Sequence, residues 1–279
     1  MSLDHDLVGN AMQMAVCRLS AGQEVYCEAG KFLFKTADVT IETRLTKPKN
    51  GVAAPTGKMQ QLLTGAMEAG KRVLAGESLA LQYFTSTGGA GVVAFAGVLP
   101  GEMRALELSP GKTWMAERDA FVAAETTVDL DIAFSGLGTG LFGGEGFVLE
   151  RFTGTGTVLI AGAGNFIDLD LSDFGGRLEV DTGCVVAFED SVKYRVERAG
   201  GLNRQGLMNG LLGGEGLALA VLEGHGKVIL QSMTIKGLAQ ALAKNEHGGP
   251  RENTGMGSMV GLGASGGLGS LGGLFGSRD

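Results

Sequence analysis

Apolar and polar residues alternate in short stretches along most of the chain. In residues 167–171 three aliphatic residues alternate with two aspartates, and residues 128–132 repeat this arrangement. A period of two places the aliphatic side chains on one face of a strand and the carboxylates on the other. Residues 158–160, Val-Leu-Ile, are apolar without alternation, which predicts a strand covered on both faces. The pattern therefore predicts an all-β protein.

Two sequence units each occur three times. The first unit is a Gly-Glu turn followed by an apolar strand, a glycine-containing turn and another apolar strand, and it occupies residues 74–97, 141–162 and 211–232. The second unit begins at Gly22, Gly111 and Gly176. Self-similarity of this kind indicates copies of one supersecondary unit. We predict an internal triplication into three tandem β-sandwich modules, within a β body over residues 1–243. Their approximate bounds are residues 7–85, 86–162 and 163–243.

Glycine pairs mark two further turns, and two segments depart from the β pattern. Gly154 and Gly156 are expected to flank a tight hairpin turn, as are Gly224 and Gly226. Residues 59–74 and 235–244 each place apolar residues on one side of a short helix, although two glycines weaken the first of these. One or two short helices are therefore expected beside the strands.

The C-terminal segment differs in composition from the rest. Residues 248–279 hold 12 of the 49 glycines of the chain. A Gly/Ser-rich segment is normally flexible, which predicts a flexible tail over residues 244–279. Its spaced leucines leave open a role in docking or self-association. The other glycines show no three-residue period, which excludes collagen.

Charge and cysteine usage narrow the class of protein. The net charge of −7 disfavours a nucleic-acid binder, which usually carries a basic excess. The three cysteines have no CxxC spacing, which predicts unpaired thiols in a reducing compartment. The N-terminus does not resemble a signal peptide, and no apolar run has the length of a membrane span. We therefore expect a cytoplasmic protein.

One carboxylate recurs at the same place in each copy of the first unit. The three residues are Glu77, Glu145 and Glu215. If the copies pack around a pseudo-threefold axis, these side chains could form a ring that binds a cation. The alternative is that each one accepts hydrogen bonds from the glycine-rich backbone of its own turn, or stays exposed.

A basic and aromatic cluster is the second candidate site. It consists of Lys193, Tyr194, Arg195 and Arg198. Single-stranded nucleic acid is bound by basic grooves with stacking aromatic residues, so this cluster is the candidate contact for RNA. No nucleophile, base and oxyanion donor assemble visibly in the sequence. We expect no enzyme activity, no catalytic, cofactor-binding or metal-binding residues, and no cofactor.

The repeated segments resemble a known bacterial family. The segments over residues 141–160, 180–202 and 211–232 are similar to a family of unknown function related to the mitochondrial protein "altered inheritance of mitochondria" number twenty-four. The resemblance covers roughly residues 7–242. It implies a three-fold duplicated β-sandwich like that of tryptophan RNA-binding attenuation protein. It implies no established catalytic or cofactor residues, and the mitochondrial relatives are linked to inner-membrane organisation.

The expected function is that of a non-enzymatic oligomeric scaffold or interaction protein. A module with few strands cannot bury both of its faces, and its open edges favour a homo-oligomer, for which a trimer is one form. A protein partner of unknown identity and a role near a membrane are left open. The alternatives are RNA binding, by analogy with the attenuation-protein fold, and binding of a small ligand or cation.

Overall fold

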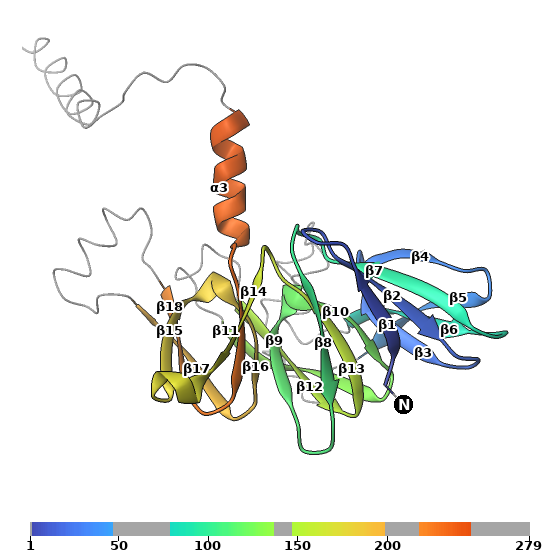
Figure 1. Ribbon diagram of the computed structural model, residues 1–279, viewed down its shortest axis with the longest axis horizontal. Helices are drawn as coiled ribbons and strands as arrows, with labels where there is room; N and C mark the ends of the chain where they lie inside the picture. The colour runs from blue at the N-terminus through green and yellow to red at the C-terminus, as the bar shows by residue number, and fades with distance from the viewer. Residues whose placement is uncertain (1, 47–78, 137–146, 199–217, 247–279) are drawn as a thin grey trace, which may run out of the picture. The chain divides into compact units, whose positions relative to one another are not determined.

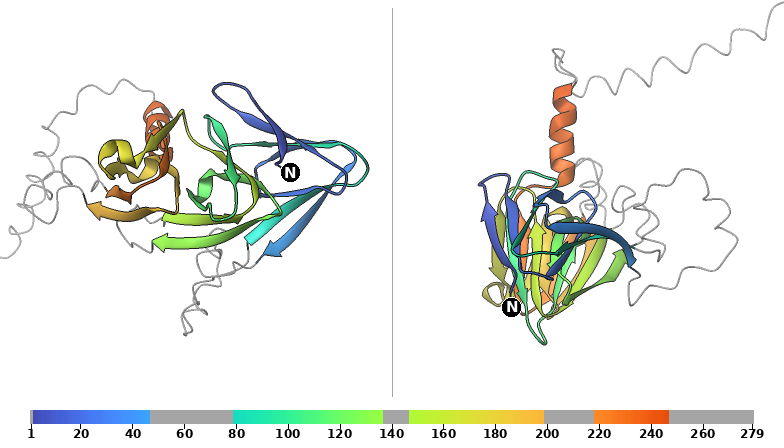
Figure 2. Two further views of the ribbon diagram at one scale, coloured as in Figure 1. Left: turned by 60° about the horizontal axis from the view of Figure 1, so that its bottom comes forward. Right: turned by 90° about the vertical axis from the view of Figure 1, so that its right-hand side faces the viewer.

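The structure is a computed structural model, and it describes residues 2–46, 79–136, 147–198 and 218–246 (Figure 1). The chain divides into two compact units, Met1–Lys236 and Gly237–Asp279. Every strand of the described ranges belongs to the first unit. Among the described residues, the one helix longer than a single turn is α3 (Ile235–Glu246), drawn in orange in Figure 2, which confirms the helix predicted near residue 235. The helix predicted over residues 59–74 lies outside the described residues.

Antiparallel sheets make up most of the described residues, which confirms the prediction of a mostly β protein. The first sheet has the order β1 (Asp4–Val8), β2 (Met14–Leu19), β7 (Gly91–Ala96), β4 (Phe32–Lys35). The second has the order β5 (Val39–Thr46), β6 (Leu79–Ser86), β3 (Glu24–Glu28), β10 (Phe121–Glu125), β13 (Gly156–Ala161), β8 (Met103–Leu108). The third has the order β11 (Val128–Gly136), β12 (Phe147–Gly154), β9 (Trp114–Glu117), β16 (Val185–Glu189), β19 (Lys227–Gln231), β14 (Phe166–Asp170). The fourth has the order β15 (Arg177–Asp181), β18 (Ala218–Gly224), β17 (Val192–Arg198).

The order of strands recurs along the chain. The set β2–β7–β4 is followed by β8–β13–β10 and then by β14–β19–β16. The set β5–β6–β3 is followed by β11–β12–β9 and then by β17–β18–β15. A register irregularity recurs with the first kind of set, and it falls between Phe32 and Phe34, between Phe121 and Ala123, and between Val185 and Ala187. Each six-stranded sheet therefore joins one set of each kind.

Two strand pairs make these joins, and we call them the inner junctions. At the first, β3 pairs with β10, so that Cys27 faces Ala123, Tyr26 faces Ala124 and Val25 faces Glu125. At the second, β9 pairs with β16, so that Ala116 faces Ala187, Met115 faces Phe188 and Trp114 faces Glu189. The two junctions have the same register relative to the irregularity described above. Both continue the backbone hydrogen bonds of one set into the next.

The prediction of hairpin turns at the two glycine pairs is wrong. β12 belongs to the third sheet and β13 to the second, so the chain crosses between sheets at Gly154 and Gly156. The chain crosses in the same way from β18 to β19 at Gly224 and Gly226. The reason for glycine is steric: Gly154 has φ +105°, and a Cβ atom there would lie 2.4 Å from the Thr127 carbonyl oxygen.

Three clusters of buried apolar residues lie between successive sheets. Phe84 of the second sheet packs edge-on against Phe95 of the first, with ring centroids 5.3 Å apart. Phe121 of the second sheet packs against Phe152 of the third, also at 5.3 Å. The third cluster lies between the third and fourth sheets and includes Phe188. The predicted strand over residues 158–160 is buried at every position, which confirms that it is covered on both faces.

A close approach of three backbone segments makes Gly101 sensitive to substitution. Gly101 forms bridges to Met12 and Gly164, and an added Cβ atom would lie 1.9 Å from the Gly162 carbonyl oxygen. We expect Gly101→Ala to lower the free energy of unfolding by about 1–3 kcal/mol, because the backbone must shift to relieve this overlap. Urea unfolding monitored by circular dichroism measures the change. The control is Gly88→Ala, where an added Cβ atom meets nothing within 4 Å. Equal midpoints for the two variants would contradict the prediction.

Candidate functional site

The cation-binding ring of the three repeated glutamates stays a prediction. Glu77, Glu145 and Glu215 precede β6, β12 and β18 in the chain, and all three lie outside the described residues. Within the described ranges, no group of three or more His, Cys, Asp and Glu side chains is arranged to hold a metal ion. The three cysteines carry free thiols, as expected from their spacing.

The residues of the basic and aromatic cluster do not share one face. All four lie on β17, where successive side chains point to opposite faces of the sheet. Tyr194 stacks on Phe188 with a centroid distance of 5.7 Å, toward the third apolar cluster. Lys193 and Arg195 are exposed on the other face, and Arg198 belongs to the same strand. The tyrosine is therefore not available to stack a base beside the two cations.

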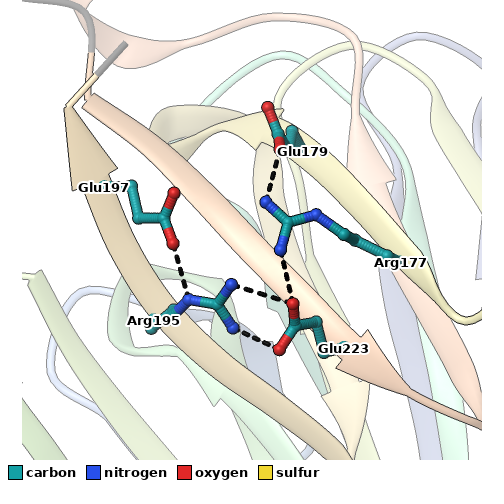
Figure 3. A network of polar contacts seen from close by, with 5 residues as sticks. All are labelled: Arg177, Glu179, Arg195, Glu197 and Glu223. Carbon is teal, nitrogen blue, oxygen red and sulfur yellow. Dashed lines mark hydrogen bonds and ion pairs between the residues drawn. The ribbon is translucent and has the colours of Figure 1, made fainter. Parts of the chain in front are cut away.

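Carboxylates surround Arg195 on the exposed face of the fourth sheet (Figure 3). Its guanidinium donates to Glu197 at 2.7 Å and to both oxygens of Glu223, one of them at 2.8 Å. Arg177 of β15 donates to Glu223 at 2.5 Å and to Glu179 at 2.6 Å. The hydrogen bonds from Arg195, followed by those from Arg177, lower the pKa of Glu223 to about 2. This face is thus a network of two cations and three anions and not a basic patch.

The outer edge of β4 exposes apolar residues whose counterparts elsewhere are buried. β4 occupies the place that β10 and β16 have in their sets, but within the described residues no strand pairs with its outer edge. Leu33 and Phe34 are 49% and 45% exposed. Their counterparts at the inner junctions are almost completely buried: Val122 0%, Ala123 0%, Val186 1% and Ala187 0%. Residues of core character therefore lie on the surface at this edge.

The outer edge of β15 is the matching edge at the other end of the series of sheets (Figure 1). β15 occupies the place that β3 and β9 have in their sets, and it too has no partner on its outer side within the described residues. Val180 is partly buried against the third apolar cluster, and Glu179 is exposed. Sequence patterns could not identify either edge, because alternation shows that a strand exists but not which strand lies beside it.

A group of buried carboxyls lies on β3, β9 and β12. Glu150 is fully buried, and neither of its carboxyl oxygens has a hydrogen-bond partner in the part of the chain that the structure describes. Burial raises the pKa of Glu150 well above its usual range, and the charge of Glu28 adds to this. Burial also raises the pKa of Glu117 to about 8, with a further contribution from Asp119. Burial therefore favours the protonated, neutral form of the Glu150 carboxyl.

A cavity of about 260 Å³ borders this group. Apolar side chains such as Leu99, Val186 and Ile235 form much of its wall, with Lys31 and Glu117 at its polar side. The Lys31 ammonium is buried and donates to the Asp119 carbonyl oxygen at 3.0 Å. A small apolar molecule with one polar group fits the chemistry of such a wall. The sequence signal that could have identified this group of buried carboxyls is Glu150, a glutamate within the largely apolar strand at residues 147–152.

The fold defines a class of mostly β proteins built from several antiparallel sheets, with one α-helix in the part of the chain that the structure describes. Residues 5–233 match the family model described as "Mitochondrial biogenesis AIM24", so the chain belongs to that family. The family resemblance of the repeated segments is confirmed. Within the described ranges, no helix is long and apolar enough to cross a lipid bilayer.

Two streptococcal proteins are similar to this chain. An uncharacterised protein of Streptococcus pyogenes serotype M6 is 30% identical over 227 residues, which is 81% of this chain and 84% of that protein. The crystal structure of a Streptococcus pyogenes protein superimposes with a TM-score of 0.64 at 24% identity, covering 87% of this chain and 99% of that chain. The second similarity shows the fold alone.

The buried acid makes stability depend on pH. The folded protein holds the Glu150 proton at pH values where the unfolded chain has lost it, so stability falls as the pH rises above the ordinary value of 4.5. We expect Glu150→Gln to match the wild type near pH 5 and to be more stable at pH 9, because the isosteric amide does not titrate. Urea unfolding at pH 5, 7 and 9 measures this. Asp173→Asn, at an exposed residue, is the control. An unchanged pH dependence in Glu150→Gln would contradict the prediction.

Proposed function

We propose that this protein is a non-enzymatic scaffold that self-associates through the outer edges of its sheets. The observation that carries the proposal is the exposure of Leu33 and Phe34 at positions where both inner junctions bury their residues. An edge strand with unpaired backbone groups and exposed apolar side chains is a template for another strand. A second chain at this edge would remove the apolar surface from water and satisfy the backbone.

The scaffold consists, in this proposal, of three copies of one β-sandwich module. The recurring strand order supports it, and so does a repeated brace in which a side-chain oxygen accepts a backbone N–H. The three braces are Thr36 Oγ1 with Val92 N (3.0 Å), Glu125 Oε2 with Thr157 N (2.8 Å) and Glu189 Oε2 with Lys227 N (2.9 Å). In this proposal the first module ends with β7, at Ala96, instead of at the predicted residue 85.

RNA binding, the alternative from fold analogy, has less support. Arg195 already contacts two carboxylates, and Tyr194 packs on Phe188. A nucleic acid would have to displace these contacts while meeting a chain of net charge −7. A role near a membrane stays open in this proposal, as a task that an assembled scaffold would perform through a further partner.

Polar residues at the β4 edge test the proposal. We expect Leu33→Ser combined with Phe34→Ser to shift the protein from an oligomer toward the 28.7 kDa chain, because the apolar contact is lost. Size-exclusion chromatography with light scattering measures the mass. The matched control is Ile167→Ser on β14. Ile167 is 45% exposed like Phe34, but its counterpart in the neighbouring set is the partly exposed Arg104 and not a buried residue.

Two outcomes would contradict the proposal. One is a wild-type protein that stays monomeric at every concentration tested. The other is an oligomer whose mass is the same in the wild type and in the double variant.

A further inference from the structure

We propose that β4 of one copy pairs with β15 of a second copy, head to tail and in the register of the inner junctions. The inference rests on the proposed self-association and names the partner and the contact. Each inner junction joins a strand in the β3 place to a strand in the β10 place. The chain carries one more strand of each kind, β15 and β4, and within the described residues neither has a partner on that side.

β4 and β15 cannot be interchanged with other outer strands. β4 lies in the first sheet and carries the register irregularity that β10 and β16 share. β15 lies in the fourth sheet and pairs with β18 as β3 pairs with β6 and β9 with β12. The occupant that fits the β4 edge is therefore a strand of the β15 kind, and a second copy of this chain supplies it.

The inner junctions fix the register of the proposed pair. Phe34 is the first residue past the irregularity in β4, as Ala123 is in β10. Val180 of β15 faces Ala220 of β18, as Cys27 of β3 faces Gln82 of β6. Ala220 and Gln82 hold equivalent positions in their sets, so Val180 corresponds to Cys27. Since Cys27 faces Ala123 at the inner junction, Phe34 faces Val180 in the proposed one. The next pair along the strands is then Lys35 with Glu179.

The side chains at these positions are complementary. Val180 already packs against the third apolar cluster, so an opposing Phe34 extends that cluster across the contact. At the inner junctions the next pair is apolar, Tyr26 with Ala124 and Met115 with Phe188.

At the proposed junction that pair is a cation opposite an anion. Opposite charges facing each other stabilise a strand pair, and like charges destabilise it. Lys35 therefore favours β15 over a second β4, and Glu179 favours β4 over a second β15. Glu179 also contacts Arg177 of its own strand at 2.6 Å, so this carboxylate lies between two cations in the proposed contact.

The contact is heterologous, because the two edges differ. Each added copy presents a new edge of the kind that it covered, until the series closes on itself. A closed ring or a filament follows from the same strand pair, and the angle between successive copies decides between them.

A charge exchange across the contact tests the inference. We expect Lys35→Glu and Glu179→Lys each to weaken self-association by at least about ten-fold, measured by light scattering over a dilution series. The double variant Lys35→Glu with Glu179→Lys should return to within about three-fold of the wild type, because the facing charges are again opposite. Lys193→Glu, on the outer strand β17 of the same sheet, is the matched control and should have no effect. Circular dichroism and urea unfolding check that each variant folds, and Lys35→Gln and Glu179→Gln replace any that does not.

The outcomes separate the two proposals. An oligomer that is unaffected by either single variant overturns the β4–β15 contact and leaves the scaffold standing. Single variants that dissociate without recovery in the double variant overturn the register, and hence the inference. A wild-type protein that never associates overturns the proposed function itself. Loss in both single variants and recovery in the double variant support the inference.

Discussion

Backbone hydrogen bonding across strand edges is the constraint on which the rest of this structure depends. A three-strand set has two edges, and the N–H and C=O groups on each edge need partners. β3 and β9 provide such partners for β10 and β16, and every paired residue of the joined edges except Glu189 is buried. The apolar clusters, the crossings between sheets and the repeated braces all follow this arrangement. The same order of sets leaves β4 and β15 as the edges of matching kind.

The sequence predicts the strands better than it predicts their partners. Alternation in residues 128–132 and 167–171 and the apolar run at 158–160 locate strands, because side-chain period depends only on local geometry. The glycines at 154 and 156 were predicted to form a hairpin, whereas the chain there passes from the third sheet to the second. A turn and a crossing both need glycine at positive φ, so the residue type cannot distinguish them. The partner of a strand is set by packing of sheets that are distant in sequence.

For the candidate site residues, too, the sequence predicts the strand but not what each side chain packs against. The Tyr194 ring lies on the opposite face from its basic neighbours because it is one residue away from each on a strand. Glu150 has no repeat signature, since its counterparts are Gln82 and Ala220. A fully buried acid without a hydrogen-bond partner among the described residues costs stability.

Cross-linking between copies tests the central claim that one strand pairing operates both within the chain and between chains. Phe34→Cys and Val180→Cys are made separately, each with the partly exposed Cys184 replaced by Ser, and the two proteins are mixed under mild oxidation. We predict a disulfide-linked pair that contains one chain of each variant, identified by mass spectrometry as a peptide joining β4 to β15. Cross-links within either variant alone, or none in the mixture while the protein is oligomeric, would contradict it.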